Sequence, residues 1–271
     1  LAENQISDIS SLSSLTNLRL LYLFRNQIID ITPVSELTNL TGLSLYSNKI
    51  TRLTPVSKLA NIEFLWLGSN KISDISPLSS LTNLKKLSLY KNNISDIQPL
   101  RQLTNLTMLE LQNNEIADPQ FEHLAVMTHL ELLNLSSTQI TDQSLIHIEN
   151  LSLLNKLYLA QTQITDQGLI NLKNLSLLNE LYLGRTQITD AGLTDLEGLI
   201  TLRHLCLYGT AITDAGLDAL KDMTVLDTLH LHNTKITDAA LLALKPLISL
   251  KSLNLESTKV TPTGLTEFKK A

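Results

Sequence analysis

Three histidines and the only cysteine of the chain lie in one short stretch, and their types suit metal binding or nucleophilic chemistry. One residue separates His204 from Cys206, and one separates His230 from His232. Because alternate residues of a β-strand point to the same face, each pair places both side chains on one side of a strand. Imidazole and thiolate are ligands of zinc and copper, and a thiol beside an imidazole is the arrangement of a nucleophile and its base.

The geometry of neighbouring strands argues against both chemistries. Parallel strands about 4.8 Å apart place Cys206 directly beside His230, with side chains that point the same way and do not converge on a tetrahedral ion. An open sheet face also excludes no water and offers no oxyanion donors. We therefore interpret the four residues as part of a binding face and expect no catalytic residue and no cofactor. A metal site at His204, Cys206, His230 and His232 is the alternative.

The strands belong to a leucine pattern that runs along the whole chain. The string L-x-x-L-x-L-x-x-N/T-x-I recurs, with a polar anchor that is Asn at a constant step of 22 and then Thr at a constant step of 24. The anchors are Asn4, Asn26, Asn48, Asn70, Asn92, Asn114, Thr138, Thr162, Thr186, Thr210, Thr234 and Thr258. Such a unit cannot bury its leucines alone, so the pattern predicts a solenoid held together by contacts between neighbouring repeats.

The predicted fold is α/β, a right-handed leucine-rich repeat solenoid (horseshoe) with a parallel sheet on the concave face. The convex side of residues 72–84 is too short and too rich in Ser and Pro for more than a 3-10 turn. From Ile188, I-T-D-A-G-L is typical of a short helix capped by Thr or Asp. We expect one domain over 1–271, with 22-residue repeats in 1–118, a transition in 119–137, and 24-residue repeats with a C-terminal helical cap in 138–271.

An aspartate stands four residues after nearly every anchor. It occurs at Asp8, Asp30, Asp74, Asp96, Asp118, Asp142, Asp166, Asp190, Asp214 and Asp238, and only Arg52 and Pro262 interrupt the row. A ladder of cation sites is one interpretation. Capping explains the period directly, because a carboxylate satisfies the free N–H groups at the start of a turn or helix. We expect each aspartate to cap the turn or helix that follows it.

The repeats resemble two known classes. Residues 4–116 resemble the internalin-type repeats of bacterial surface proteins, whose unit L-T-N-L-x-x-L-x-L-x-x-N-x-I-x-D-I-x-P-L is matched from Leu81 to Leu100. Residues 138–265 resemble the I-T-D-x-G-L class of F-box-associated and large bacterial repeat proteins. The resemblance implies a non-catalytic protein–protein interaction module, with a bacterial surface or secreted adhesin or effector as one setting. An intracellular adaptor or regulatory substrate receptor is the alternative.

Aromatic residues are concentrated at the outward positions of the predicted strands. Nine of the eleven fall there: Tyr22, Phe24, Tyr46, Phe64, Trp66, Tyr90, Tyr158, Tyr182 and Tyr208. Leucine and isoleucine fill the core, so the rings are available as the anchors that protein interfaces use. The six from Tyr22 to Tyr90 form a contiguous patch on the first four strands, which is the leading candidate for partner binding.

Charge is also sorted along the predicted concave strip. Nine basic residues lie there (Arg25, Lys49, Lys71, Lys86, Lys91, Lys156, Arg185, Lys235 and Lys259) against four acidic ones (Glu110, Glu115, Glu180 and Glu256), although the net charge of the chain is −5. A positive strip favours an acidic protein partner. The acidic total argues against nucleic-acid binding.

Two further expectations concern the membrane and the first repeat. No apolar run approaches the roughly 20 residues of a membrane span, so we expect no membrane insertion. Ile6, Ile9, Leu12 and Leu15 have no preceding repeat to pack against. The sequence therefore predicts either a lost capping segment or end-to-end self-association through the uncapped N-terminus.

Overall fold

The computed structural model describes residues 1–270, so Ala271, the last residue of the expected domain, lies outside the described residues. The chain forms two compact units, Leu1–Asn134 (unit 1) and Leu135–Ala271 (unit 2). The boundary between them falls within 119–137, the predicted transition between the two repeat lengths. Organisation as one domain stays a prediction.

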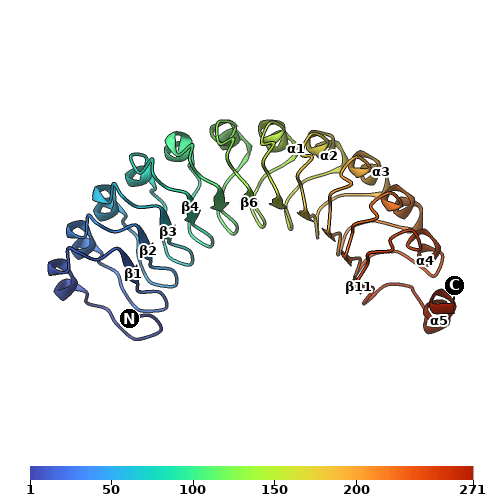
Figure 1. Ribbon diagram of the computed structural model, residues 1–271, viewed down its shortest axis with the longest axis horizontal. Coiled ribbons are helices and arrows are strands. Elements are labelled where there is room, and N and C mark those ends of the chain that lie inside the picture. Colours follow the sequence, from blue (N-terminus) through green and yellow to red (C-terminus); the bar gives the residue numbers. More distant parts are fainter. Residues whose placement is uncertain (271) are drawn as a thin grey trace. The chain divides into compact units, whose positions relative to one another are not determined.

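Unit 1 is built from short parallel strands that alternate with 3-10 turns (Figure 1). The strands are β1 (Leu20–Tyr22), β2 (Gly42–Ser44), β3 (Phe64–Trp66), β4 (Lys86–Ser88), β5 (Met108–Glu110) and β6 (Leu132–Asn134). The turns are η1 (Ser10–Ser14), η2 (Thr32–Glu36), η3 (Thr54–Lys58), η4 (Ser76–Leu78), η5 (Gln98–Gln102) and η6 (Asp118–Leu124). Each of β1 to β5 pairs in register with the equivalent residues of the strand that follows it, for example Leu43 with Leu65. The predicted 3-10 turns are confirmed.

Unit 2 has strands β7 (Lys156–Tyr158), β8 (Glu180–Tyr182), β9 (His204–Cys206), β10 (Thr228–His230) and β11 (Ser252–Asn254). Its helical segments are α1 (Asp142–Leu145), η7 (Ile146–Ile148), α2 (Asp166–Leu169), η8 (Ile170–Leu172), α3 (Asp190–Leu193), η9 (Thr194–Leu196), η10 (Asp214–Leu220), α4 (Ala240–Ala243) and α5 (Pro262–Lys270). The predicted short helices are present, and three of them are one α-helical turn continued by a 3-10 turn. At four of them the side chain of the preceding Thr accepts a backbone N–H: Thr141, Thr165, Thr189 and Thr213.

The core of each unit is a stack of leucines and isoleucines. In β1 to β10 both leucines of every L-x-L are buried, as the alternation predicts. Each repeat therefore contributes little core of its own and is stabilised by its neighbours. With parallel strands, buried leucine rows, and turns or short helices opposite them, the predicted leucine-rich repeat fold is confirmed.

The asparagine anchors of unit 1 join each repeat to the one before it. The side-chain oxygen of Asn92 accepts the backbone N–H of Ile72 at 3.0 Å, and its amide donates to the carbonyls of Leu67 at 3.1 Å and Leu89 at 2.9 Å. Asn26, Asn48, Asn70 and Asn114 make the equivalent bonds. In unit 2 the anchor acts within its own repeat, since the Thr186 hydroxyl donates to the Leu183 carbonyl at 2.6 Å.

The aspartates behave differently in the two units. In unit 1 the expected cap is present at Asp8, Asp30, Asp74 and Asp96, each of which accepts the backbone N–H two residues later. Hydrogen bonds from the Thr32 side chain and backbone hold the pKa of Asp30 below its ordinary value. In unit 2 the expectation is wrong. Asp166 accepts the backbone N–H of Thr189 at 2.7 Å and its hydroxyl at 2.6 Å, and Thr189 belongs to the following repeat.

The same link between repeats recurs through unit 2. Asp142, Asp190, Asp214 and Asp238 bind Thr165, Thr213, Thr237 and Thr261 in this way. Threonine caps four of these helical segments, so the carboxylate is available to the next repeat. The glycine of I-T-D-x-G-L leaves space for the aspartate carboxylate of the preceding repeat, because a Cβ at Gly192 would lie 2.4 Å from the Asp166 Oδ1 atom.

Substitution of this glycine is expected to weaken the link between repeats. Gly192→Ala should lower the free energy of unfolding by about 1–2 kcal/mol, because the added methyl displaces Asp166 from Thr189. Gly198→Ala is the matched control in the same repeat, since a Cβ there meets nothing within 4 Å. Urea denaturation of the two variants would contradict this account if both lost the same stability.

Candidate functional site

All six aromatics of the predicted patch lie on the outward face of the unit 1 strands, which we call the unit 1 strand face. Tyr22, Phe64 and Trp66 are within β1 and β3, where buried leucines flank the outward positions. Phe24, Tyr46 and Tyr90 follow β1, β2 and β4 at the last outward position of the motif. Tyr22 is 46% exposed, and the other five are half-buried. The structure therefore brings the predicted residues together.

The rings of this patch pack against one another along the face. Phe24 and Tyr46 stack with centroids 4.7 Å apart, and Phe64 and Trp66 stack at 6.0 Å. The Tyr90 ring covers Gly68 so closely that a Cβ on that glycine would lie 2.0 Å from the ring. Burial, and then the nearby Tyr46, raise the pKa of Tyr90 above its ordinary value. The aromatic surface is thus ordered before any partner arrives.

Small residues alternate with the aromatic residues on this face, and one buried serine hydroxyl has no hydrogen-bond partner among the described residues. Ser44 and Ser88 flank Trp66 on the neighbouring strands, and they are only 4% and 2% exposed. The Ser88 hydroxyl is buried without a hydrogen-bond partner among the described residues. Gly42 is covered by the Leu20 side chain, whose Cδ2 atom would lie 2.7 Å from an added Cβ. This alternation lets large side chains cover small neighbours.

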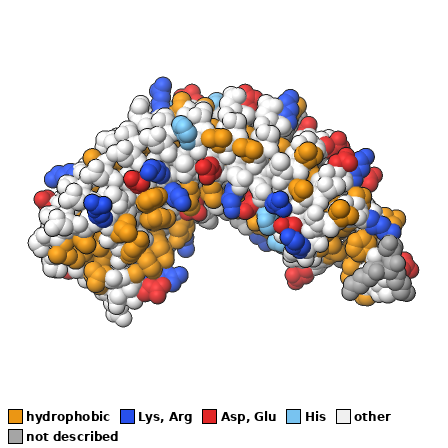
Figure 2. All heavy atoms as spheres, viewed as in Figure 1, with side chains coloured by type: hydrophobic (Ala, Val, Ile, Leu, Met, Phe, Trp, Pro, Cys, Tyr) orange, Lys and Arg blue, Asp and Glu red, His pale blue; other side chains and the backbone are white. Residues whose placement is uncertain are grey.

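Cationic side chains surround the patch, and some are already paired. Figure 2 shows hydrophobic side chains gathered over the N-terminal repeats of unit 1, with Lys and Arg at their margin. Arg25 forms an exposed ion pair with Glu3 at 2.6 Å. The Lys86 ammonium lies 6.0 Å from the Phe64 ring centroid, within reach of a cation–π contact. Lys71 and Lys91 make no ion pair among the described residues.

The outward face of the unit 2 strands, the unit 2 strand face, carries the other three predicted aromatics. Tyr158 and Tyr182 stack at 4.6 Å. The Tyr158 hydroxyl donates to Glu180 at 2.7 Å, and Lys156 pairs with the same carboxylate at 2.6 Å. Burial raises the pKa of Glu180, but these two hydrogen bonds and the attraction of the Lys156 and His204 charges together leave the pKa below its ordinary value. Tyr208 stacks on His232 at 4.8 Å.

The histidines and the cysteine are neighbours on this face but do not form a ligand set. Cys206 is in register with His230, as predicted. The His230 and His232 rings are 6.0 Å apart, and His204 lies 3.5 Å from Asp227. Across the described part of the chain, no group of three or more His, Cys, Asp or Glu side chains is placed to hold a metal ion. Burial raises the pKa of the Cys206 thiol, which weakens it as a nucleophile.

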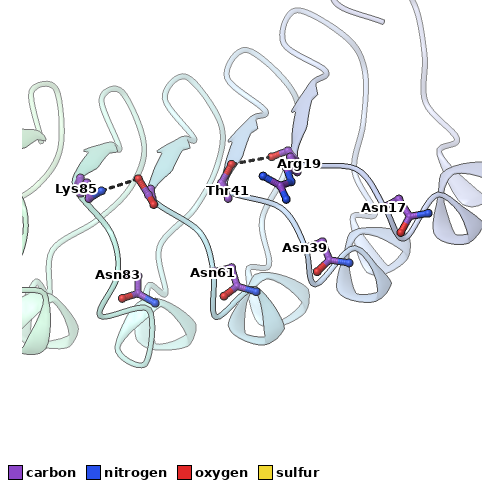
Figure 3. A pocket seen from close by; sticks show the side chains of 8 residues that line it. Asn17, Arg19, Asn39, Thr41, Asn61, Asn83 and Lys85 are labelled. Atoms are coloured by element: carbon purple, nitrogen blue, oxygen red, sulfur yellow. Dashed lines mark hydrogen bonds and ion pairs between the residues drawn. The ribbon is translucent and has the colours of Figure 1, made fainter.

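A polar groove in unit 1 was not expected from the sequence. It has a volume of about 740 Å³ and is lined by Asn17, Arg19, Asn39, Thr41, Asn61, Glu63, Asn83 and Lys85 (Figure 3). The amides of three of these asparagines donate to backbone carbonyls of the preceding repeat at 2.9–3.1 Å. Lys85 pairs with Glu63 at 2.7 Å. The asparagines recur every 22 residues, and that period is the signal that reveals the row. These bonds give the groove a structural role.

Two remaining expectations concern the end of unit 1 and the membrane. Ile9 is buried, whereas Leu15 is 47% exposed at the first repeat. Self-association through this end stays a prediction. None of the described helices combines the length and the apolar character that crossing a membrane requires.

Leucine rows, polar anchors and an outward strand face together define a leucine-rich repeat protein. Sequence comparison agrees, because the family model for leucine-rich repeats in two copies matches residues 1–36, 38–80 and 82–124, and a second leucine-rich repeat model matches 126–148. The chain belongs to the leucine-rich repeat family. No curated protein matches its sequence.

Solved structures of internalins resemble this chain in both sequence and fold. An internalin (inlF) from Listeria monocytogenes is 31% identical, with a TM-score of 0.79 over 99% of this chain and 83% of that one. Internalin C2 (inlC2) from the same organism is 32% identical, with a TM-score of 0.67 over 72% of this chain and 83% of that one. The predicted resemblance to bacterial internalin-type repeats is confirmed.

A plant receptor shares the fold alone. The leucine-rich repeat ectodomain of the receptor kinase GASSHO1/SCHENGEN3 from Arabidopsis thaliana, solved in complex with CASPARIAN STRIP INTEGRITY FACTOR 2, is 17% identical. Its TM-score is 0.63, over 97% of this chain and 36% of that one.

Proposed function

We propose that this protein is a non-catalytic recognition module whose protein partner binds the unit 1 strand face. The observation that carries the proposal is the ordered patch of Tyr22, Phe24, Tyr46, Phe64, Trp66 and Tyr90. Large rings held half-exposed supply contact area at a low entropic cost, because packing has already restricted them. A patch of this kind in a soluble protein marks an interaction site.

The charges around the patch favour a partner with an acidic surface. Lys71 and Lys91 have no ion pair within the described residues, and Lys86 lies over Phe64. Cations at the rim of an apolar patch increase the rate of encounter with an acidic surface and orient the partner. The apolar centre then supplies most of the binding free energy.

The relatives support a recognition role and point to a setting. The plant ectodomain is solved in complex with CASPARIAN STRIP INTEGRITY FACTOR 2, so a chain of this fold can act in recognition. The two internalins described above, both from a bacterium, are each more than 30% identical to this chain, and we therefore propose a bacterial surface or secreted protein. An intracellular adaptor or regulatory substrate receptor is the second candidate. Identification of the partner would separate the two.

Affinity capture with a triple variant tests the proposed site. Native and host lysates are passed over the wild-type protein and over Phe64→Ala/Trp66→Ala/Tyr90→Ala, and recovered partners are compared. We expect at least a tenfold loss of affinity, because anchors in a desolvated patch typically carry about 2 kcal/mol or more each. The matched control is Ile29→Ala/Val126→Ala, which removes side chains that are 61% and 43% exposed in unit 1 but outside the patch.

Two outcomes bear on the assignment once circular dichroism shows that the variants fold. A partner lost by the triple variant and kept by the control supports the unit 1 strand face. A partner kept by both overturns that assignment and transfers attention to Tyr158, Tyr182 and Tyr208.

A further inference from the structure

Three histidine side chains gather on the unit 2 strand face, whereas the aromatic patch of unit 1 contains none. His204 lies on β9, and His230 and His232 lie on and just beyond β10. The His232 ring is stacked on the Tyr208 ring, and the Arg185 guanidinium lies 5.7 Å from the centroid of the same Tyr208 ring. Tyr208 in turn covers Gly184, where an added Cβ would lie 2.0 Å from the ring. Packing therefore fixes these groups in place.

The permanent charges of this face are net positive, and its imidazoles can add to them. Lys156 and Glu180 form an ion pair, and the other outward charges of β7 to β11 and the turns after them are Arg185, Lys235 and Lys259 against Glu256. At neutral pH the face therefore carries a small positive charge. Protonation of His204, His230 and His232 would add up to three positive charges at one place.

The groups that surround the imidazoles leave room for an added anion. Asp227 lies 3.5 Å from His204 and 3.9 Å from Lys251, so this carboxylate is shared. The strand neighbour of His230 is the buried thiol of Cys206 on one side and Asn254 on the other. The Nδ1 atom of His232 is buried and has no hydrogen-bond partner among the described residues. Neither His230 nor His232 has a carboxylate partner of its own among the described ion pairs.

Protonation without a ligand is unfavourable here. Burial, and then the neighbouring His232 and His204, hold the pKa of His230 below its ordinary value. Ligand carboxylates placed beside the protonated imidazoles would offset the repulsion between their positive charges. A ligand that supplies them must therefore bind together with protons.

We propose that the unit 2 strand face binds an acidic peptide segment and that this binding takes up protons, so that affinity increases under mildly acidic conditions. The inference goes beyond the proposed function, since it concerns a different unit and different residues. Its failure would leave the unit 1 strand face as a recognition site unaffected.

The composition of the face favours a carboxylate-bearing peptide over a sulfated glycan. Glu180 and Glu256 lie among the imidazoles and would repel a dense polyanion. The stacked Tyr158 and Tyr182 rings offer apolar contact to the aliphatic part of Glu or Asp side chains.

The expected pH dependence follows from proton linkage. Peptide carboxylates stay ionised well above about pH 4.3, so the ligand keeps its charge while the imidazoles titrate. Each proton taken up on binding changes the affinity by up to about tenfold per pH unit. Binding should therefore become stronger as the pH falls through the range in which His230 is neutral in the free protein, and should level off once its imidazole is protonated in both states.

Fluorescence anisotropy of a labelled hexaglutamate peptide tests this directly. Titrations of the whole protein at about pH 5.5 and about pH 7.5, at one low ionic strength, should give at least about tenfold tighter binding at the lower pH. Labelled hexaglutamine is the uncharged control and should not bind at either pH. Equal hexaglutamate affinity at the two pH values, or no binding at the lower one, would overturn the proposal.

Variants assign the effect to the imidazoles. His230→Asn/His232→Asn should lose most of the pH dependence, whereas His147→Asn, in η7 away from the strand face, should keep it. Trp66→Ala should also keep it, which separates this site from the unit 1 strand face. Unchanged pH dependence in the double variant overturns the assignment.

Two further measurements keep the test decisive. Should the double variant fail to fold, calorimetric heats of wild-type binding in buffers of different ionisation enthalpy measure the protons taken up, and zero uptake overturns the proposal. A heparin-derived oligosaccharide is titrated in parallel. If it binds more tightly than hexaglutamate and displaces it, the ligand class is a sulfated glycan and the peptide proposal is wrong.

Discussion

Asn92→Ala is expected to lower the free energy of unfolding by about 3–5 kcal/mol, one of the largest effects of any single substitution in this chain. The Asn92 side chain is 9% exposed, and its hydrogen bonds join two repeats. Alanine would leave the Ile72 N–H and the Leu67 and Leu89 carbonyls without their partner in a buried setting. Each orphaned group costs about 1–3 kcal/mol, less what relaxation and water recover.

The matched comparison is the threonine anchor of unit 2. Thr186→Val keeps the shape of the side chain and removes one hydrogen bond, to the Leu183 carbonyl of the same repeat. We expect a loss of about 1 kcal/mol there. Urea denaturation can be followed by circular dichroism and by Trp66, whose fluorescence reports on unit 1 because it is the only tryptophan. Equal losses in the two variants would show that the inter-repeat bonds of the asparagine contribute little.

Phe121→Ala is expected to lower the free energy of unfolding by a similar amount, about 3–5 kcal/mol. Phe121 lies in η6 and is the largest fully buried side chain of the protein's described residues. The earlier turns place Val34, Val56, Leu78 or Leu100 in the core, so this turn fills its space with a larger group. Truncation removes apolar contact and leaves a cavity that the backbone of one short turn cannot close.

A graded substitution separates cavity formation from disruption of the turn. Phe121→Leu should cost about 1–2 kcal/mol, because most of the volume is kept. Denaturation midpoints that fall in the order wild type, leucine, alanine would agree with a packing role. A loss as large for leucine as for alanine would contradict it and implicate the ring itself.

The leucine rows and the repeat lengths could be predicted because each buried position recurs at a fixed step. The direction of the aspartate bonds could not. Asp166 is separated by a constant number of residues both from its own helix and from Thr189 of the next repeat. The repeat period therefore does not indicate which of the two it binds. The left-handed residue before each anchor was also hidden, since Arg25, Lys91 and Arg185 stand where glycine would have signalled it.

The candidate site was found from residue type and strand alternation, but its form depends on neighbouring repeats. Alternation places Tyr90 outward, whereas its position over Gly68 depends on a residue one repeat earlier. Register placed Cys206 beside His230 correctly. Whether their side chains converge depends on rotamers, which strand spacing alone does not determine.

The Asp-to-Thr links of unit 2 have a consequence for how the array can change in length. Every interior repeat there offers a carboxylate to the repeat that follows and a threonine to the repeat that precedes. Duplication or deletion of a whole 24-residue module therefore recreates the same pairing at the new junction and exposes no unmatched polar group. The number of strands offered to a ligand can grow or shrink by gene duplication, while the local chemistry that holds each one stays unchanged.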